Sequence, residues 1–493
     1  MPAPYRVARA RTTRSLRNRV LASALGLACA SGVALSARDA AASGFLYTKF
    51  GGDYGQPAIG SAYSVYFNPA AIADAHGTQL VLDGMFAFRH ATYNRPASAL
   101  SPSAGKSATD PIYVAANTGT ATANGVQGAP YFGVTTDFGG KVPVFAGFAS
   151  YVPEGGYASY SHRSQWQNDP RAPGAYDGVQ RWALVSGSQI SWWNTLAAGA
   201  TLESLRLSIG GSASIVRDSL TSLIARNKDA SDDLATANGI PTEGRSLLDV
   251  SGTHVVLAIG LFWKPLEDGT LRIGASFTTR QGLARTRLKG SLQTQFGAGE
   301  NENQAADLLM TFPDIFRLGV AYRATPKIDL RLDFEWVTWS NLKRQCIVVS
   351  GANCSVQTTG AENIPPGSGS QILLNLDREW QDAYALRAGV GWLVTPNTEL
   401  MGSLGFDTSA VPAAHLDATY FDAFKIIGSL GMRQHFAERW FFGATLSEMY
   451  FLNVDNTGSA VNNSLQIPSR SPSNAGTYKS SITFLDVNLG VRF

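Results

Sequence analysis

The sequence predicts an all-β protein, a transmembrane antiparallel β-barrel whose strands each carry one apolar and one polar face. Three features predict it: strict alternation in segments such as 327–339, an export-type leader at 1–42, and a C-terminal strand that ends on Phe493. In an outer-membrane barrel the apolar face contacts lipid and the charged face lines the lumen. The alternation in 327–339 places Ile328, Leu330, Leu332, Phe334 and Trp336 opposite Asp329, Arg331, Asp333 and Glu335.

The composition fits many short strands joined by turns. The chain has 493 residues with 50 glycines, 10% aromatic residues and only 16% charged residues. Seven of its 40 basic residues and one of its 37 acidic residues lie in residues 1–42, which leaves 33 basic and 36 acidic residues in the rest. This balance gives no electrostatic support for nucleic-acid binding.

The first 42 residues are typical of a signal peptide. An arginine-rich start precedes an apolar stretch at 20–35, and Ala40 and Ala42 fit an A-x-A cleavage site. The apolar stretch is shorter than the ~20 residues that a membrane-spanning helix needs. We therefore expect a cleaved leader at 1–42 and export to the bacterial outer membrane.

Alternating segments recur from residue 79 to the C-terminus, and they suggest roughly 14 to 16 strands. Short turns join some of them, as at 138–141, and long polar stretches join others, as at 345–375. Short turns at one end and long loops at the other are typical of outer-membrane barrels. One segment, 218–239, is predicted instead to be an amphipathic helix packed within a loop.

The C-terminal strand separates a barrel from a soluble sandwich. Residues 484–493 alternate apolar and small or polar side chains, and the chain stops on Phe493. A terminal strand of this kind resembles the signal by which the barrel-insertion machinery recognises its substrates. The small residues on its second face fit a lumen better than a packed core.

Residues 44–76 differ from the rest because they lack alternation and are rich in Gly, Ala and Ser. Such a backbone cannot face lipid with its polar groups unsatisfied, so we expect it inside the barrel or in water. Asn68 and Pro69 suit a turn, since Asn bonds locally and Pro fixes φ. A purely structural turn and a direct part in gating both remain open for them.

Other side chains suggest no chemistry. Cys346 and Cys354 are a candidate disulfide, because an exported chain meets an oxidising compartment, with two free thiols as the alternative. The six histidines show no i,i+4 pair, and no G-x-S-x-G elbow is present. We therefore expect no catalytic residues, no metal site, no cofactor and no enzyme activity.

Three blocks resemble the FadL family of outer-membrane channels for long-chain fatty acids and other hydrophobic compounds. The first, GSAYSVYFNPAAIA at 60–73, carries an Asn-Pro-Ala element. The second is the run 312–342, with FRLGVAY followed by DFEWVTWS, and the third is 378–412, with REWQDAYALRAG and FDTSAVP. Together with the final strand, the blocks span nearly the whole chain after the leader.

The resemblance implies a 14-stranded barrel with a lumen plugged by an N-terminal hatch. It divides the chain into a signal peptide (1–42), a hatch (43–78) and an outer-membrane barrel with long extracellular loops (79–493). It makes Phe67, Asn68, Pro69 and Ala70 candidates for hatch or gating residues. It also implies a lateral opening at a kinked third strand, here near 141–156, where Pro143 and Gly147 are candidates; a strand-start proline and a packing glycine are the alternative roles.

The expected function is a channel that takes up long-chain fatty acids or similar hydrophobic compounds by capture, hatch rearrangement and lateral release. The alternatives are uptake of aromatic hydrocarbons by the same kind of channel and, less in keeping with a plug, a general porin. The expected partners are the hydrophobic ligand, outer-membrane lipid and lipopolysaccharide, and the insertion machinery. We expect a monomer.

Overall fold

The computed structural model describes residues 50–103, 108–140, 142–227, 231–234, 236–237, 240–241, 243–297, 299, 301–354, 371–461 and 471–493. The predicted signal peptide (1–42) and the first residues of the predicted hatch (43–49) lie outside these residues.

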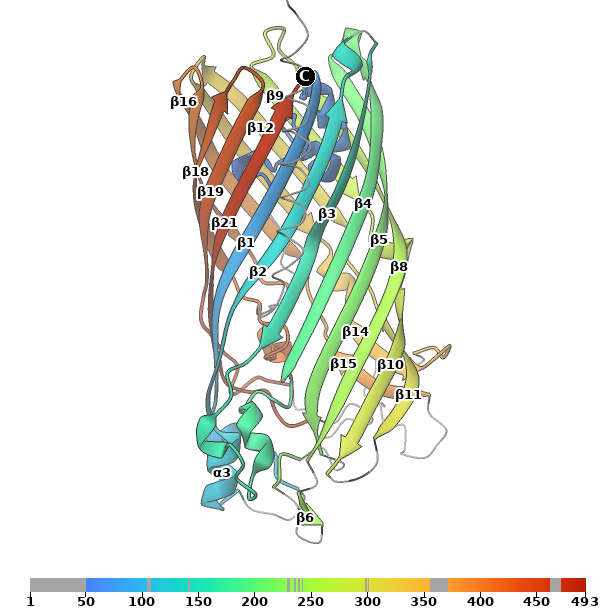
Figure 1. Cartoon of the computed structure of the whole chain (residues 1–493), viewed down its shortest axis with the longest axis vertical. Helices are drawn as coiled ribbons and strands as arrows, with labels where there is room; N and C mark the ends of the chain where they lie inside the picture. The colour runs from blue at the N-terminus through green and yellow to red at the C-terminus, as the bar shows by residue number, and fades with distance from the viewer. Residues whose placement is uncertain are drawn as a thin grey trace, which may run out of the picture. The chain divides into compact units, whose positions relative to one another are not determined.

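Fourteen antiparallel spans close into a barrel (Figure 1). Strand β1 pairs with β2 on one side and with the C-terminal strand β21 on the other, so the first and last spans complete the ring. Ten spans are single strands: β1 (Thr78–Arg95), β2 (Gly119–Thr136), β3 (Val144–Ser159), β4 (Ser186–Leu202), β5 (Leu207–Arg226), β8 (Gly244–Trp263), β17 (Thr398–Asp407), β18 (Lys425–Phe436), β19 (Trp440–Phe451) and β21 (Thr477–Arg492).

Each of four neighbouring spans is divided into two strands. They are β9 (Leu271–Thr278) with β10 (Thr286–Phe296), β11 (Glu302–Met310) with β12 (Ile315–Thr325), β13 (Ile328–Val337) with β14 (Arg344–Val349), and β15 (Ile372–Asp377) with β16 (Ala383–Thr395). The break between β13 and β14 follows Trp336, and the break between β15 and β16 precedes Tyr384. The rings of these two residues stack on one another on the lipid side. Aromatic rings favour the membrane interface, so the breaks mark the level at which these spans leave the bilayer.

The loops distinguish the two ends of the barrel. At the end where the C-terminus lies, consecutive strands are joined by turns such as 203–206, 326–327 and 396–397 (Figure 1). The longer connections lie at the other end, where Figure 1 shows α3 and β6. By the usual arrangement of outer-membrane barrels, the short-turn end is periplasmic and the long-loop end extracellular.

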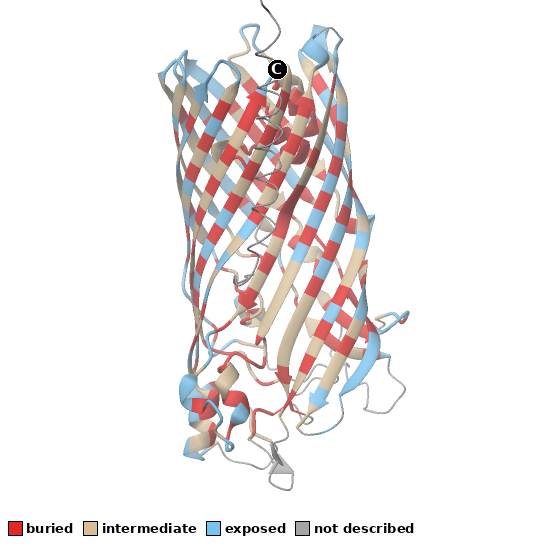
Figure 2. Ribbon diagram, viewed as in Figure 1, coloured by how far each residue is buried: buried red, intermediate tan, exposed pale blue. Residues whose placement is uncertain are grey.

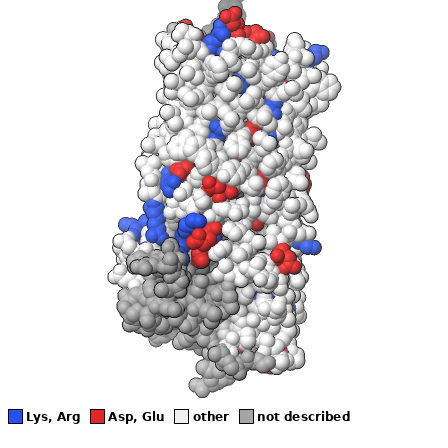
Figure 3. Space-filling model, turned by 180° about the vertical axis from the view of Figure 1, so that it is seen from behind, with Lys and Arg blue, Asp and Glu red and all other residues white. Residues whose placement is uncertain are grey.

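The inverted faces predicted from the sequence are confirmed along β13. Leu330 and Leu332 are 45% and 46% exposed on the outer wall, whereas Arg331 and Glu335 are 7% exposed and face the lumen. Figure 2 shows the same alternation of buried and exposed residues on many strands. Figure 3 shows a mainly uncharged outer wall, with charged side chains gathered at the top of the view and in clusters across its middle.

Leu332→Arg is expected to impair assembly, because a cation on the lipid face near the bilayer centre costs about 2–4 kcal/mol. Heat-modifiable gel migration and urea unfolding of the barrel in vesicles report the loss. Leu332→Ala serves as the matched control, since it removes the side chain without adding a charge. Equal tolerance of both variants would contradict the face assignment.

Helical and minor elements lie in the hatch, turns and loops. They are η1 (Gly52–Tyr54), α2 (Ser64–Phe67), η2 (Pro69–Asp74), η3 (Ala97–Ala99), α3 (Pro111–Asn117), η4 (Phe138–Gly140), η5 (Ser164–Trp166), η6 (Pro173–Asp177), η7 (Glu203–Leu205), η8 (Gln281–Leu283), η9 (Trp339–Asn341), η10 (Ala413–His415), β6 (Thr236–Ala237), β7 (Ile240–Pro241) and β20 (Val454–Asp455). Among the described residues, no helix is long and apolar enough to cross a membrane.

The helix predicted at 218–239 is wrong for its first part. Residues 218–226 continue β5, where they pair with β4 through Leu223 and with β8 through Arg226. Leu220, Leu223 and Ile224 fit a helical spacing, but ladder pairing on both sides of the strand overrides this local preference.

Candidate functional site

The hatch segment, residues 50–76, lies against the lumen wall. Phe50, Tyr66 and Phe67 are buried in the main core cluster with side chains from the barrel strands. Arg317 on β12 donates from Nη2 to the Tyr66 hydroxyl at 3.0 Å, and the Tyr131 hydroxyl on β2 donates to the Ala62 carbonyl at 2.7 Å. The segment is thus bonded to opposite parts of the wall.

Asn68 is the centre of the hatch contacts. Its side-chain amide donates to the Pro57 carbonyl within the hatch and to the Leu261 carbonyl on β8, both at 2.9 Å. Its side-chain oxygen accepts from the Ala70 N–H at 3.1 Å, which caps η2. Asn68 is fully buried, and its one side chain both stabilises the turn and bonds the turn to the barrel wall.

The four hatch candidates from the sequence are all brought together at this wall. Phe67, Asn68, Pro69 and Ala70 are buried, and the Phe67 carbonyl accepts from Ser276 Oγ at 2.6 Å. Their part in gating remains a prediction.

Glycines make room for the hatch on four neighbouring strands. A Cβ at Gly210, Gly260, Gly274 or Gly319 would collide with Pro69–Ala70, Asn68, Pro57 or Pro57–Ala58 respectively. The ladder places Gly210 opposite Gly260 and Gly274 opposite Gly319. The absence of side chains here allows the two backbones to approach closely, which a larger residue would prevent.

An apolar cavity, called here the outer cavity, lies at the extracellular end and measures about 120 Å³ as traced by the centre of a water molecule. Its apolar lining consists of Trp182, Leu220, Ile224, Leu248, Leu292, Leu308, Ile347, Leu374, Leu376, Leu416 and Val461. The polar groups on its wall include Arg226, Arg378, Asp417 and Tyr420. The combination of an apolar wall with polar and charged side chains is typical of a ligand site.

The two arginines of the outer cavity differ in their partners. Arg378 donates to Gln345 Oε1 and to Asp417 Oδ2, both at 2.8 Å, and stacks on the ring of Tyr420. Burial raises the pKa of Tyr420, so its hydroxyl stays neutral. Arg226, the last residue of β5, is half-buried and has no carboxylate or hydrogen-bond partner for its guanidinium in the part of the chain that the structure describes.

Extracellular loops form a cap joined by buried ion pairs. Arg95 at the end of β1 pairs with Asp232 at 2.7 Å, and both side chains are almost fully buried. Arg181 pairs with Glu243, which also binds Arg245. Burial raises the pKa of the Glu243 carboxyl, but the two arginines outweigh burial, so the net shift is downward and the group stays ionised.

The barrel wall has a gap in its ladder between β2 and β3. Residues 131–136 pair with 146–151, and the ladder then ends; the next backbone bond between these chain segments is from Ser161 N–H to the Thr122 carbonyl. On its other side β3 pairs with β4, with one extra residue between Tyr151 and Glu154. Pro153 lies in this bulge and has no N–H to donate.

The gap adjoins the outer cavity. A smaller cavity is lined by Gly155 and Gly156 on β3, and it shares Leu220 and Tyr420 with the outer cavity. These glycines carry no side chains, and the side chains of Val152 and Gln127 lie next to Gly155. The smaller cavity therefore lies beside the interrupted part of the β2–β3 ladder.

Pro143 and Gly147, the sequence-based candidates for the opening, lie outside the gap. Pro143 precedes β3. Gly147 pairs with Thr135 on β2 and Ala197 on β4, and a Cβ there would collide with Val65 of the hatch. The ladder is interrupted further along the strand, at Pro153, so these two residues fit the packing roles that the sequence left open.

Cys346 and Cys354, the candidate pair from the sequence, form a disulfide. Cys346 on β14 bonds to Cys354 in the connection that follows, and Cys346 is fully buried. The bond holds the start of this connection against β14. The next residue of that strand, Ile347, lines the outer cavity.

Comparisons with known proteins agree with this architecture. The family described as "Outer membrane protein transport protein (OMPP1/FadL/TodX)" matches residues 204–464, more than half of the chain. A search of the curated proteins found no match.

Solved structures share the fold at low sequence identity. A Pseudomonas aeruginosa FadL homologue is 14% identical, with a TM-score of 0.70 over 92% of this chain and 100% of the other. The P. putida toluene transporter TodX is 12% identical, with a TM-score of 0.56 over 88% and 94%. The Ralstonia pickettii toluene transporter TbuX is 13% identical, with the same TM-score over the same shares.

The plugged barrel, its apolar cavity and the family match lead to one assignment. The chain belongs to the OMPP1/FadL/TodX family of outer-membrane transport proteins and is a β-barrel channel for the uptake of hydrophobic compounds.

Proposed function

We propose that the transported compound is a long-chain fatty acid or a similar long apolar carboxylate. The observation that carries this proposal is Arg226, a guanidinium without a protein partner among the described residues, on the wall of a cavity whose large apolar side chains are mainly leucine and isoleucine. A charge beside an apolar site is costly unless it is paired, and a carboxylate ligand would pair with it. The alkyl chain would then lie along the apolar lining.

Aromatic hydrocarbons are the second candidate. TodX and TbuX, which share the fold, are described as toluene transporters. A neutral aromatic compound could fill part of the same apolar wall, but it would leave the charge of Arg226 unmatched. The cavity therefore favours the carboxylate.

The proposed route begins at the extracellular cap, passes through the outer cavity and ends at the gap between β2 and β3. The hatch, taken as residues 43–78, keeps the lumen closed to hydrated solutes. We further propose that residues 1–42 are a cleaved signal peptide, that the C-terminal strand is read by the insertion machinery, and that the barrel works as a monomer among outer-membrane lipid and lipopolysaccharide. No chemical step is proposed.

Arg226→Gln tests the fatty-acid proposal. Loss of a charge-assisted hydrogen bond should weaken oleate binding by roughly 10- to 100-fold, since such bonds contribute about 1.5–3 kcal/mol. Uptake of oleate and toluene should be measured side by side in cells that lack their own long-chain fatty acid channel. Oleate uptake should fall with the variant while toluene uptake does not.

Arg217→Gln is the matched control, because Arg217 lies on the same strand but is exposed on the outer wall. An equal loss with both variants would indicate a general effect on the barrel. Uptake of toluene alone by the unaltered protein would overturn the fatty-acid proposal, and free passage of small sugars without either compound would favour a porin.

A further inference from the structure

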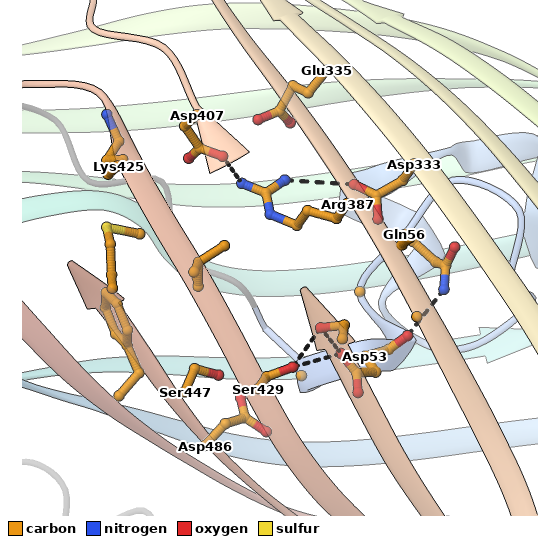
Figure 4. Close-up of a pocket in the computed structure, with 18 of the residues that line it drawn as sticks. Asp53, Gln56, Asp333, Glu335, Arg387, Asp407, Lys425, Ser429, Ser447 and Asp486 are labelled. Atoms are coloured by element: carbon orange, nitrogen blue, oxygen red, sulfur yellow. Dashed lines mark hydrogen bonds and ion pairs between the residues drawn. The ribbon is translucent and has the colours of Figure 1, made fainter. Parts of the chain in front are cut away.

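A second cavity, called here the inner cavity, lies beside the hatch on the wall formed by β13 and β16–β21 (Figure 4). It also measures about 120 Å³ as traced by the centre of a water molecule. Hatch residues Gly52, Asp53 and Gln56 form one side of it, and Trp339 and Trp380 lie on its wall as well. It shares no lining residue with the outer cavity.

The lining of the inner cavity carries an excess of carboxylates. Its acidic side chains are Asp53, Asp333, Glu335, Asp407, Asp422 and Asp486, against the basic side chains Arg331, Arg387 and Lys425. These six and three charges leave a formal surplus of three negative charges. The surplus is opposite in sign to the unmatched charge of the outer cavity.

Four of the carboxylates form ion pairs with three cations. Arg387 bonds to Asp407 at 2.7 Å and to Asp333 at 3.5 Å, as Figure 4 shows. Lys425 bonds to Asp422 at 2.5 Å, and Arg317, which does not line the cavity, bonds to Glu335 at 2.7 Å.

Arg331, the third basic residue of the lining, does not neutralise any carboxylate of the lining. Arg331 pairs with Glu399 and Asp329, neither of which lines the cavity. Asp53 and Asp486 are therefore the two carboxylates of the lining for which the described residues provide no ion pair.

Asp486 on β21 is almost fully buried, at 3% exposure. Its Oδ1 accepts from the Asn488 side-chain amide at 3.1 Å, and its carboxyl group is also hydrogen-bonded to that of Asp83, so the two acids share a proton. Asp83 on β1 lies diagonally across the ladder, since Asp83 pairs with Asn488 and Met85 pairs with Asp486. Asp83 accepts from the Gly51 N–H at 2.8 Å and is also hydrogen-bonded to the Tyr63 hydroxyl.

Asp53 presents a similar arrangement from the hatch. Its Oδ1 accepts from Ser403 at 2.9 Å and from Ser429 at 3.0 Å, and its Oδ2 has no hydrogen-bond partner among the described residues. The cation nearby, Arg433, stacks on the rings of Tyr54 and Phe441 and forms no described ion pair with these acids. The site therefore has a free carboxylate oxygen on the hatch, at Asp53, and on the wall a hydrogen-bonded pair of acids, Asp83 and Asp486, that carries one negative charge.

The remainder of the inner cavity is apolar and aromatic. Its lining includes Met85, Trp339, Trp380, Ile427, Met449, Phe451 and Phe484. Aromatic faces attract cations, and their area accommodates an apolar tail. Carboxylates beside aromatic side chains suit a ligand that is both positively charged and hydrophobic.

We propose that the inner cavity binds a hydrophobic ammonium compound, with its charged nitrogen between Asp486 and Asp53 and its apolar part against the aromatic wall. Buried negative charge without a counter-charge is costly, and an ammonium group supplies a positive charge and hydrogen-bond donors to both Asp53 and the Asp83–Asp486 pair. The two cavities then select apolar ligands of opposite charge. Since Asp53 belongs to the hatch, the bound cation also joins the hatch to the wall.

Calorimetry on the full-length barrel in a non-ionic detergent tests the site with two probes of equal chain length, dodecylammonium and dodecanoate. Dodecylammonium should bind at neutral pH, and Asp486→Asn should weaken its binding by roughly tenfold or more without changing dodecanoate binding. Asp53→Asn, which alters the hatch and leaves the barrel strands unchanged, should act in the same direction.

Asp249→Asn is the matched control, because Asp249 is exposed on the outer wall of β8. Arg226→Gln should weaken dodecanoate binding alone, so that failure of either site can be recognised separately. Heat-modifiable migration confirms that each variant is folded. No binding of dodecylammonium, or equal binding to both folded Asp→Asn variants and the unaltered protein, would overturn the proposal.

Discussion

Deletion of residues 44–76 is expected to leave a folded barrel that conducts ions across planar bilayers far better than the intact protein. The barrel ladder closes through β1 and β21 without the hatch, so the wall does not depend on these residues for its backbone bonds. A barrel of 14 spans is wide enough for an aqueous channel when nothing fills it. In this protein Phe50, Tyr66 and Phe67 of the hatch occupy that space.

Single-channel current in symmetric salt measures the effect, and uptake of hydrophobic cargo should become less selective at the same time. Asn68→Ala should have a smaller effect of the same sign, because it removes the bonds to Pro57, Leu261 and Ala70 but leaves the segment in place. Asn124→Ala, at an exposed position on β2, is the control. A deleted barrel that folds but conducts no better would show that something else closes the lumen.

The barrel could be predicted from the sequence because the membrane imposes a local pattern. Every residue of a spanning strand faces lipid or lumen, so Leu330, Arg331 and Leu332 reveal their environments by alternation alone. The pattern weakens above the bilayer, where both faces of a strand meet water or loops. The first half of β2, 119–130, therefore has no clear alternation of apolar and polar residues in its sequence.

The breaks in four neighbouring spans had no separate signal. Short polar or aromatic stretches such as 338–343 look like strand ends in a single sequence, and only pairing with adjacent strands shows that β13 and β14 belong to one span. The same limitation produced the wrong helix at 218–239. These elements are determined by pairing with strands that lie far along the chain, and a single sequence does not show which strands pair.

The candidate site was predicted in part. Asn68 was found because turn formation by Asn-Pro is a local property. The outer cavity was not, since Arg226, Leu374 and Tyr420 come from segments nearly 200 residues apart and only barrel closure brings them together. Nothing in the sequence around Arg226 distinguishes it from other arginines. Its candidate role in ligand binding depends on the absence of a carboxylate beside it among the residues that the structure describes.

Deletion of the single residue Pro153 is expected to abolish most fatty-acid uptake while preserving the barrel. The bulge between Tyr151 and Glu154 contains one residue more than the facing stretch of β4, so removing one residue restores a continuous register with Trp193 and Ser191. Glu154 keeps its inward direction, because the deletion removes the extra residue without changing the alternation that follows. The straightened strand could then pair with β2 beyond Tyr131, where the ladder now ends.

Closing the ladder in this way removes the route from the smaller cavity at Gly155 and Gly156 to the side of the barrel. Oleate uptake by cells measures the effect, while oleate binding to the purified barrel should remain, since Arg226 and the apolar lining are unchanged. Pro153→Ala keeps the extra residue but restores an N–H, so it should cause a smaller loss. Normal uptake by a folded Pro153-deleted barrel would show that the substrate leaves past the hatch and not through the gap between β2 and β3. The exit would then be the same opening that raises ion conductance when residues 44–76 are deleted.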